Sequence, residues 1–155
     1  MKRVADWFTE YGESHAHSTN KLLHWICVPL IVLSLMGFLW SIPTPNAVSS
    51  ISPWLNLATL IVLLAVVYYA VLSPALAIGI TIAFVVLLTV VQALDTLPWP
   101  LWLSSLVMFV GAWIGQFIGH AIEGKRPSFL KDIQFLMIGP LWLIGSLYRR
   151  LGIRY

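Results

Sequence analysis

Four runs of apolar residues, each about as long as a membrane-crossing helix, dominate the sequence. They extend from about Leu22 to Trp40, from Trp54 to Leu72, from Pro74 to Leu94 and from Leu101 to Ile122. A helix needs about 20 apolar residues to cross a hydrocarbon core of roughly 30 Å, because each residue advances the axis by about 1.5 Å. The sequence therefore predicts four transmembrane helices.

The composition excludes a soluble protein. Only 10% of the 155 residues are charged, whereas soluble domains carry about 25%, so too little polar chain remains to cover four apolar helices. The single cysteine, Cys27, excludes a disulfide framework and a Cys-rich zinc site. A disordered chain and a nucleic-acid-binding protein are excluded as well. We predict one all-α domain, a polytopic membrane helical bundle over residues 1–155.

Lysine and arginine occur only before the first apolar run and after the fourth. They are Lys2, Arg3, Lys21, Lys125, Arg126, Lys131, Arg149, Arg150 and Arg154. Because basic segments stay on the cytoplasmic side of a membrane, both termini are expected in the cytoplasm, which requires an even number of spans. We predict a multi-pass protein of a bacterial inner membrane, with the endoplasmic reticulum as the alternative.

Two shorter segments are expected on the same side of the membrane. Phe135–Leu147 is apolar but too short to cross easily, and Gly139-Pro140 interrupts its middle. It is flanked by basic residues and predicts a short C-terminal re-entrant or interfacial helix. Val4–Ser14 predicts a short amphipathic helix that lies on this face.

The histidines lie at the two ends of the predicted bundle. His15, His17 and His24 precede or open the first span, and His120 lies near the end of the fourth. In a bundle of four antiparallel spans, both positions are on the cytoplasmic side at similar depth. Residues that are far apart in the sequence can therefore meet there.

Helical spacing joins other polar residues to these histidines. Asn20 precedes His24 by four residues, and Gln116, His120 and Glu123 are separated by four and three residues, so each set shares one helix face. Ionisable groups at membrane depth are costly and usually face the bundle interior with a partner. The two polar faces are thus predicted to face each other.

The residues alone leave several interpretations of this cluster open. In one, the histidines are interfacial and bond to lipid headgroups. In another they hold a metal ion, since imidazole suits iron, zinc, copper and nickel. Four histidines are too few for a di-iron enzyme of the desaturase type, so a mononuclear site of two to four histidines, with or without Glu123, is the largest that fits. Glu123 could instead fix a histidine tautomer.

Two separated segments carry polar motifs in a recognisable order. They read Tyr11-Gly12-Glu13-Ser14-His15, Asn20-Lys21-Leu22-Leu23-His24 and Cys27-Val28-Pro29 in the first segment, and Gln116-Phe117-Ile118-Gly119-His120, Glu123 and Lys125-Arg126-Pro127 in the second. These motifs resemble those of the Mpo1-like family, and the later Gly139-Pro140 fits it too. Cys27 stands where many members carry glycine, and His17 matches no family histidine.

The resemblance implies an iron(II)-dependent dioxygenase that shortens 2-hydroxy fatty acids by one carbon, in fatty acid α-oxidation. It implies that His15, His24 and His120 hold the iron, with Asn20 and Glu123 as supporting catalytic residues. A 2-hydroxy acid can chelate iron through two oxygens, and an ion with few protein ligands keeps positions open for this chelate and for dioxygen. The site is expected at the cytoplasmic interface, with the acyl chain between the helices.

Other roles and another class of protein remain open. Lys125 or Arg126 is a candidate partner of the substrate carboxylate, and the alternative is that both contact anionic lipid headgroups. The chain also fits a non-catalytic membrane protein that binds lipid or a partner, with a structural metal or none. A small transporter is disfavoured, because the spans carry no charged residue at mid-membrane.

Overall fold

The computed structural model describes residues 3–127 and 134–155, and these residues form seven helices and no strand. The helices are α1 (Val4–Gly12), α2 (Ser18–Trp40), α3 (Asn46–Ser49), α4 (Leu57–Leu72), α5 (Pro74–Asp95), α6 (Leu101–Glu123) and α7 (Phe135–Arg150). The predicted all-α class is confirmed. Two of the flanking cations discussed above, Lys2 and Lys131, lie outside the described residues.

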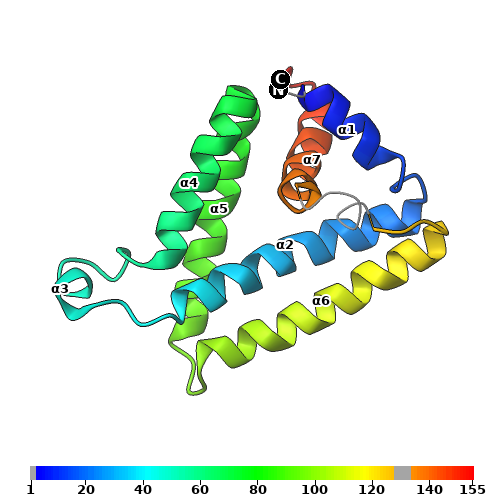
Figure 1. The fold of residues 1–155 in the computed structure, drawn as a ribbon. Coiled ribbons are helices and arrows are strands. Elements are labelled where there is room, and N and C mark those ends of the chain that lie inside the picture. The colour runs from blue at the N-terminus through cyan, green and yellow to red at the C-terminus, as the bar shows by residue number, and fades with distance from the viewer. Residues whose placement is uncertain (1–2, 128–133) are drawn as a thin grey trace.

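Two antiparallel helix pairs build the molecule (Figure 1). The long helices α2 and α6 lie side by side, and α4 and α5 form a hairpin that meets the far end of α2 at a wide angle. Helices α1 and α7 occupy the angle between the two pairs, near the start of α2. Segments from the two ends of the chain are therefore neighbours at one end of the molecule.

Three helices, α2, α5 and α6, are long and apolar enough to cross a membrane. They match three of the predicted spans closely and indicate a multi-pass membrane protein. The fourth helix is shorter than predicted, because α4 has 16 residues and a length of about 24 Å. It begins at Leu57, so the predicted start at Trp54 is wrong. The side chain of Asn56 accepts a hydrogen bond from the Thr59 N–H at 3.1 Å, and such a cap starts a helix.

The short segments at the ends of the chain are helical, as predicted. Helix α1 buries Trp7, Phe8 and Tyr11 on one face, and the Trp7 and Phe135 rings pack edge to face with centroids 5.3 Å apart. Helix α7 extends to Arg150, beyond the predicted end, and packs against α1, α2 and α5. The two helices thus form a cap over the start of α2.

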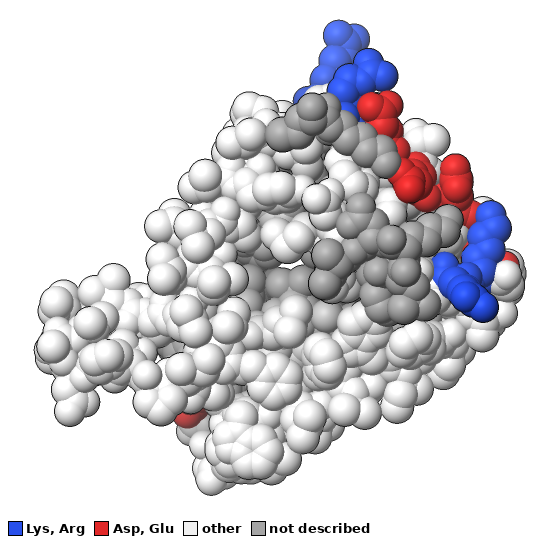
Figure 2. All heavy atoms as spheres, in the orientation of Figure 1, with Lys and Arg blue, Asp and Glu red and all other residues white. Residues whose placement is uncertain are grey.

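Charged side chains are confined mainly to one end of the molecule. Figure 2 shows lysine and arginine side chains along the edge formed by the chain termini, α1 and the adjoining ends of α2 and α6. At the opposite end, the Trp40 indole donates a hydrogen bond to Asp95 at 3.1 Å. The surface between these ends exposes large apolar side chains such as Leu63, Val71 and Ile82, as a lipid-facing surface does.

Small residues allow α2 and α6 to approach closely. A Cβ atom on Gly37 would collide with the Ser105 hydroxyl, and one on Gly115 would lie 2.6 Å from the Cys27 sulfur. Small residues at such contacts are typical of membrane helices. Gly111 lies on the same helix as Gly115 but faces open space, so it does not contribute to the contact.

The Gly37→Ala variant should be less stable than the wild type. The added methyl group collides with Ser105, and overpacking of this kind costs about 1–3 kcal/mol. Gly111→Ala is the matched control, because its methyl group meets nothing and alanine favours a helix. Thermal unfolding in detergent measures the difference, and equal melting temperatures of the two variants would contradict the close contact.

Candidate metal centre

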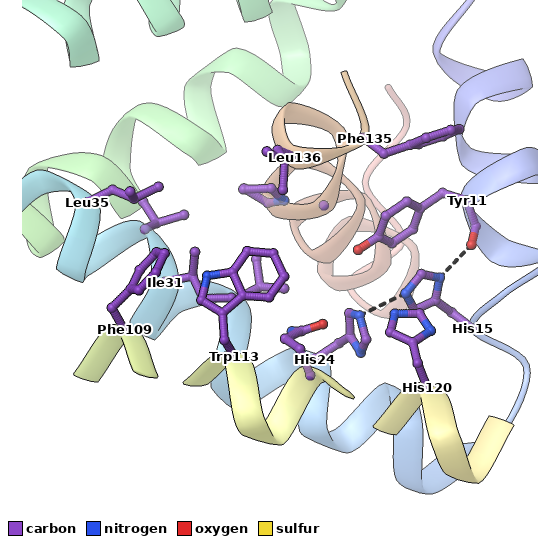
Figure 3. Close-up of a pocket in the computed structure, with 15 residues that line it drawn as sticks. Tyr11, His15, His24, Ile31, Leu35, Phe109, Trp113, His120, Phe135 and Leu136 are labelled. Atoms are coloured by element: carbon purple, nitrogen blue, oxygen red, sulfur yellow. Dashed lines mark hydrogen bonds between the residues drawn. The ribbon is translucent and has the colours of Figure 1, made fainter. Parts of the chain in front are cut away.

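Three histidines from distant parts of the chain meet in the interior. His15 lies between α1 and α2, His24 is on the second turn of α2, and His120 is near the end of α6. Each side chain is at most 4% exposed, and one ring nitrogen of each lies within 4.8 Å of the other two. Figure 3 shows the three rings converging at one end of a cavity.

Backbone carbonyl groups hold two of these rings in defined tautomers. His15 Nδ1 lies 2.5 Å from the Tyr11 carbonyl oxygen, and His24 Nδ1 lies 2.9 Å from that of Asn20. A carbonyl oxygen only accepts hydrogen bonds, so each Nδ1 carries a proton. Burial, together with the nearby His24, lowers the pKa of His15 to about 3, so this ring is neutral at neutral pH. Its Nε2 therefore presents a lone pair.

The Nε2 lone pairs of His15 and His24 face each other in the interior, which favours a bound cation. His15 Nε2 and His24 Nε2 are 2.8 Å apart, and two lone pairs at this distance repel unless a shared proton or a metal ion lies between them. His120 Nδ1 is buried and makes no hydrogen bond within the described residues. Ligands about 2.1 Å from an ion in tetrahedral geometry lie roughly 3.4 Å from one another, within the range of the separations seen here. The donor set therefore fits a transition metal ion.

Asn20 and Glu123 position the segment that carries His15. The Glu123 carboxylate accepts hydrogen bonds from the Ala16 and His17 N–H groups at 2.9 and 2.8 Å, and from the Asn20 amide at 3.2 Å. The same amide group donates to the Ser14 carbonyl at 3.0 Å. The backbone after His15 is thereby tied to α6. In the described residues neither side chain bonds to a histidine ring, so the tautomers are set by the backbone carbonyls rather than by Glu123.

The other candidate residues lie outside the cluster. His17 is exposed and caps α2, accepting a hydrogen bond from the Thr19 N–H at 3.2 Å. The Lys125 ammonium donates to the Glu13 carbonyl at 2.5 Å. Arg126 is exposed, and neither Lys125 nor Arg126 lines the cavity beside the histidines. The structure therefore brings together three of the four histidines. Lys125 and Arg126, the predicted partners of the substrate carboxylate, lie at the surface.

An apolar cavity of about 190 Å³ extends from the histidines. It follows the seam between α2 and α6 to Leu35 and Phe109, and the first half of α7 lies over it (Figure 3). Leu35 is 11 residues after His24, which corresponds to roughly 16 Å along the helix. An apolar cavity of about 150 Å³ accepts a benzene molecule, so this one has room for part of an alkyl chain.

Some residues of the site were not assigned a role from the sequence. The Tyr11 ring stacks on His15 with centroids 4.0 Å apart, and Trp142 of α7 lies 5.7 Å from the same ring. Gln116 lies one turn before His120 and lines the cavity. The four-residue spacing already places Gln116 on the helix face of His120, and the same spacing before His15 could have indicated Tyr11. Trp142 gives no such signal, because its place depends on how α7 packs.

These features define a helical membrane protein with a buried three-histidine group at the head of an apolar cavity. The family model described as "2-hydroxy-palmitic acid dioxygenase Mpo1-like" matches residues 1–151, so the chain belongs to the Mpo1-like family. It is similar to the 2-hydroxy-palmitic acid dioxygenase MPO1 of Saccharomyces cerevisiae, with 26% identity over 144 residues, 92% of this chain and 78% of the yeast protein. No solved structure matches the chain significantly.

The Glu123→Ala variant should lose both stability and metal affinity. Hydrogen bonds to a charged acceptor contribute about 1.5–3 kcal/mol each, and solvent screening at this half-buried position reduces the total to about 2–3 kcal/mol. We expect cobalt(II) affinity, measured by visible absorption, to fall about 10–100-fold, as when other supporting residues of metal sites are removed. Glu13→Ala is the control, since this side chain is exposed and Lys125 bonds to the Glu13 backbone carbonyl rather than to its carboxylate. Unchanged affinity in Glu123→Ala would contradict the positioning role.

Proposed function

We propose that this protein is an iron(II)-dependent dioxygenase that shortens 2-hydroxy fatty acids by one carbon, a step of fatty acid α-oxidation. The observation that carries the proposal is the convergence of His15, His24 and His120 at one end of an apolar cavity. Membership of the Mpo1-like family, named for a 2-hydroxy-palmitic acid dioxygenase, supports it. A polar ligand head would lie at the histidines and its alkyl chain would follow the cavity.

The three histidines would hold the ion as neutral ligands. Iron(II) would supply coordination sites for the carboxylate and hydroxyl oxygens of the substrate and for dioxygen. The conversion needs no external reductant, since a 2-hydroxy acid and dioxygen balance to the shorter acid, carbon dioxide and water. The Tyr11 and Asn20 carbonyls keep the ring protons on Nδ1 and so leave Nε2 free to bind.

The surrounding side chains bind the substrate and exclude water. Leu35, Phe109 and Trp113 line the part of the cavity away from the histidines, where an acyl chain would be buried at about 0.8 kcal/mol per methylene group. Asn20 and Glu123 act on the site indirectly, by holding the His15 segment against α6. The near-complete burial of the histidines keeps bulk water from the ion.

The membrane arrangement follows from the same elements. We propose that α4 crosses the bilayer as a fourth span, because Ser73 alone separates it from α5 and the two helices pack as a hairpin. Both termini and the metal centre would lie at the cytoplasmic interface, where the basic residues gather. A bacterial inner membrane is the proposed location, with the endoplasmic reticulum as the alternative.

Replacement of each buried histidine should abolish iron binding and turnover. His15→Ala, His24→Ala and His120→Ala each remove one of the three nitrogen ligands, whereas His17→Ala removes only an exposed helix cap. Purified variants are loaded with iron(II) without oxygen, analysed for iron, and then incubated with oxygen and 2-hydroxypalmitate. Mass spectrometry should detect the acid one carbon shorter only for the wild type and His17→Ala.

Two other results would point to a different protein. Iron in all four variants at the wild-type level would contradict the metal centre. Iron lost from the three buried-histidine variants, with no shortened acid from the wild type, would contradict catalysis and favour a non-catalytic membrane protein with a structural metal.

The Phe109→Ala variant should prefer longer substrates. Phe109 lies at the end of the cavity opposite the histidines (Figure 3), and its loss makes room for further methylene groups. Each buried methylene contributes about 0.8 kcal/mol, or about four-fold in kcat/KM. Val107→Ala, at a position 66% exposed on the same helix, should leave the preference unchanged. An identical chain-length profile for Phe109→Ala would show that the chain lies elsewhere.

A further inference from the structure

A second groove, which shares Val28, Val32 and Pro140 with the cavity beside the histidines, has one polar end and one apolar end, as a lipid does. At the charged end of the molecule, a recess between α2 and α7 is lined by Ser18, Lys21, Ser146, Arg149 and Arg150, together with apolar contacts. Below it, an apolar groove continues between α2, α5 and α7. Trp25 lines both, so the two form one path that is cationic at the surface and apolar toward the membrane.

The spacing of residues on α2 makes this path continuous. Ser18, Lys21, Trp25, Pro29 and Val32 follow one another at intervals of three or four residues and line the recess and then the groove. Residues at this spacing share one helix face. The face extends over 14 residues, or about 21 Å, which spans the interface and part of the hydrocarbon core.

The recess carries positive charge without a matching carboxylate. No aspartate or glutamate lines the recess or the groove, and no described carboxylate forms an ion pair with Lys21 or Arg150. The Arg150 guanidinium lies 5.6 Å over the Trp25 ring, at the junction of the two parts. Arg149 donates a hydrogen bond to Ser146 at 2.8 Å. These groups make the recess cationic where it adjoins the apolar groove.

We propose that this α2–α7 groove binds an anionic phospholipid, with the phosphate at Lys21 and Arg150 and an acyl chain against Trp25, Pro29 and Val32. The charge selects an anionic headgroup, and the apolar continuation selects a lipid over a soluble phosphate. The proposal does not depend on the dioxygenase function. Its polar part, at Lys21 and Arg150, lies outside the histidine cavity, whereas Val32 lines both the groove and that cavity.

The bound lipid would stabilise the cover of the metal centre. Trp142 lines the recess and also packs against the rings of Tyr11 and His15, with centroids 5.5 and 5.7 Å away. A phospholipid that bridges α2 and α7 therefore holds α7 over the cavity. An anionic lipid should accordingly raise the melting temperature of the metal-free protein.

The test measures lipid binding to the metal-free, full-length protein in a neutral detergent. Native mass spectrometry and thermal unfolding follow titration with dioleoyl phosphatidylglycerol, dioleoyl phosphatidylcholine or inorganic phosphate. Lys21→Gln and Arg150→Gln should each weaken phosphatidylglycerol binding about five-fold, since a basic residue near a membrane surface contributes about 1 kcal/mol. The double variant should lose roughly 25-fold if the effects add. Arg154→Gln is the control, because this exposed cation lines neither part of the groove.

The expected result is tighter binding and a higher melting temperature with phosphatidylglycerol than with phosphatidylcholine or phosphate. This preference should be reduced in Lys21→Gln and in Arg150→Gln and kept in Arg154→Gln. Equal binding of the two lipids would overturn the proposal. So would an equal loss in Arg154→Gln, which would show general attraction to the charged end, or stabilisation by phosphate alone, which would show that the apolar groove is not used. Each single variant's melting temperature in phosphatidylcholine reports whether it is folded.

Discussion

Imidazole lone pairs that face one another in an apolar interior are the constraint on which this structure depends. The ring protons of His15 and His24 are committed to backbone carbonyls, so the facing Nε2 atoms have no hydrogen to share while both rings are neutral. An unsatisfied buried polar group costs about 1–3 kcal/mol. A metal ion would convert this repulsion into three bonds. This arrangement of histidines is therefore explained by ion binding, whereas it would be unfavourable as an ordinary part of the apolar core.

The rest of the fold holds this arrangement in place. Small residues such as Gly37 and Gly115 let α2 and α6 pack closely along their length, which brings His24 and His120 to the same level. Gly119 serves the same purpose at the site, because a Cβ atom there would collide with the Asn20 amide oxygen. Glu123 ties the His15 segment to α6 through backbone N–H groups. Membrane packing and the metal centre therefore depend on the same contacts.

Much of this could be predicted from the sequence, because the signals are physical and local. Length and hydropathy located α2, α5 and α6. The restriction of basic residues to the chain ends predicted that the histidines lie on the same side of the membrane. The start of α4 was missed because the Asn56 cap outweighs the apolar Trp54 before it. The wide angle between the helix pairs and the approach of Trp142 to His15 depend on tertiary packing, which leaves no periodic pattern. Gly111 and Gly115 are four residues apart on α6, but only Gly115 faces α2, and the spacing alone does not reveal this difference.

X-ray absorption at the iron edge of the wild-type protein, loaded anaerobically, would show directly whether the buried histidines bind the ion. We expect a single bound ion per chain whose spectrum shows imidazole scattering from three histidine ligands, with the remaining positions filled by oxygen. A spectrum with oxygen ligands alone, or no retained iron after removal of the excess, would contradict the claim that the buried histidines exist to bind a metal.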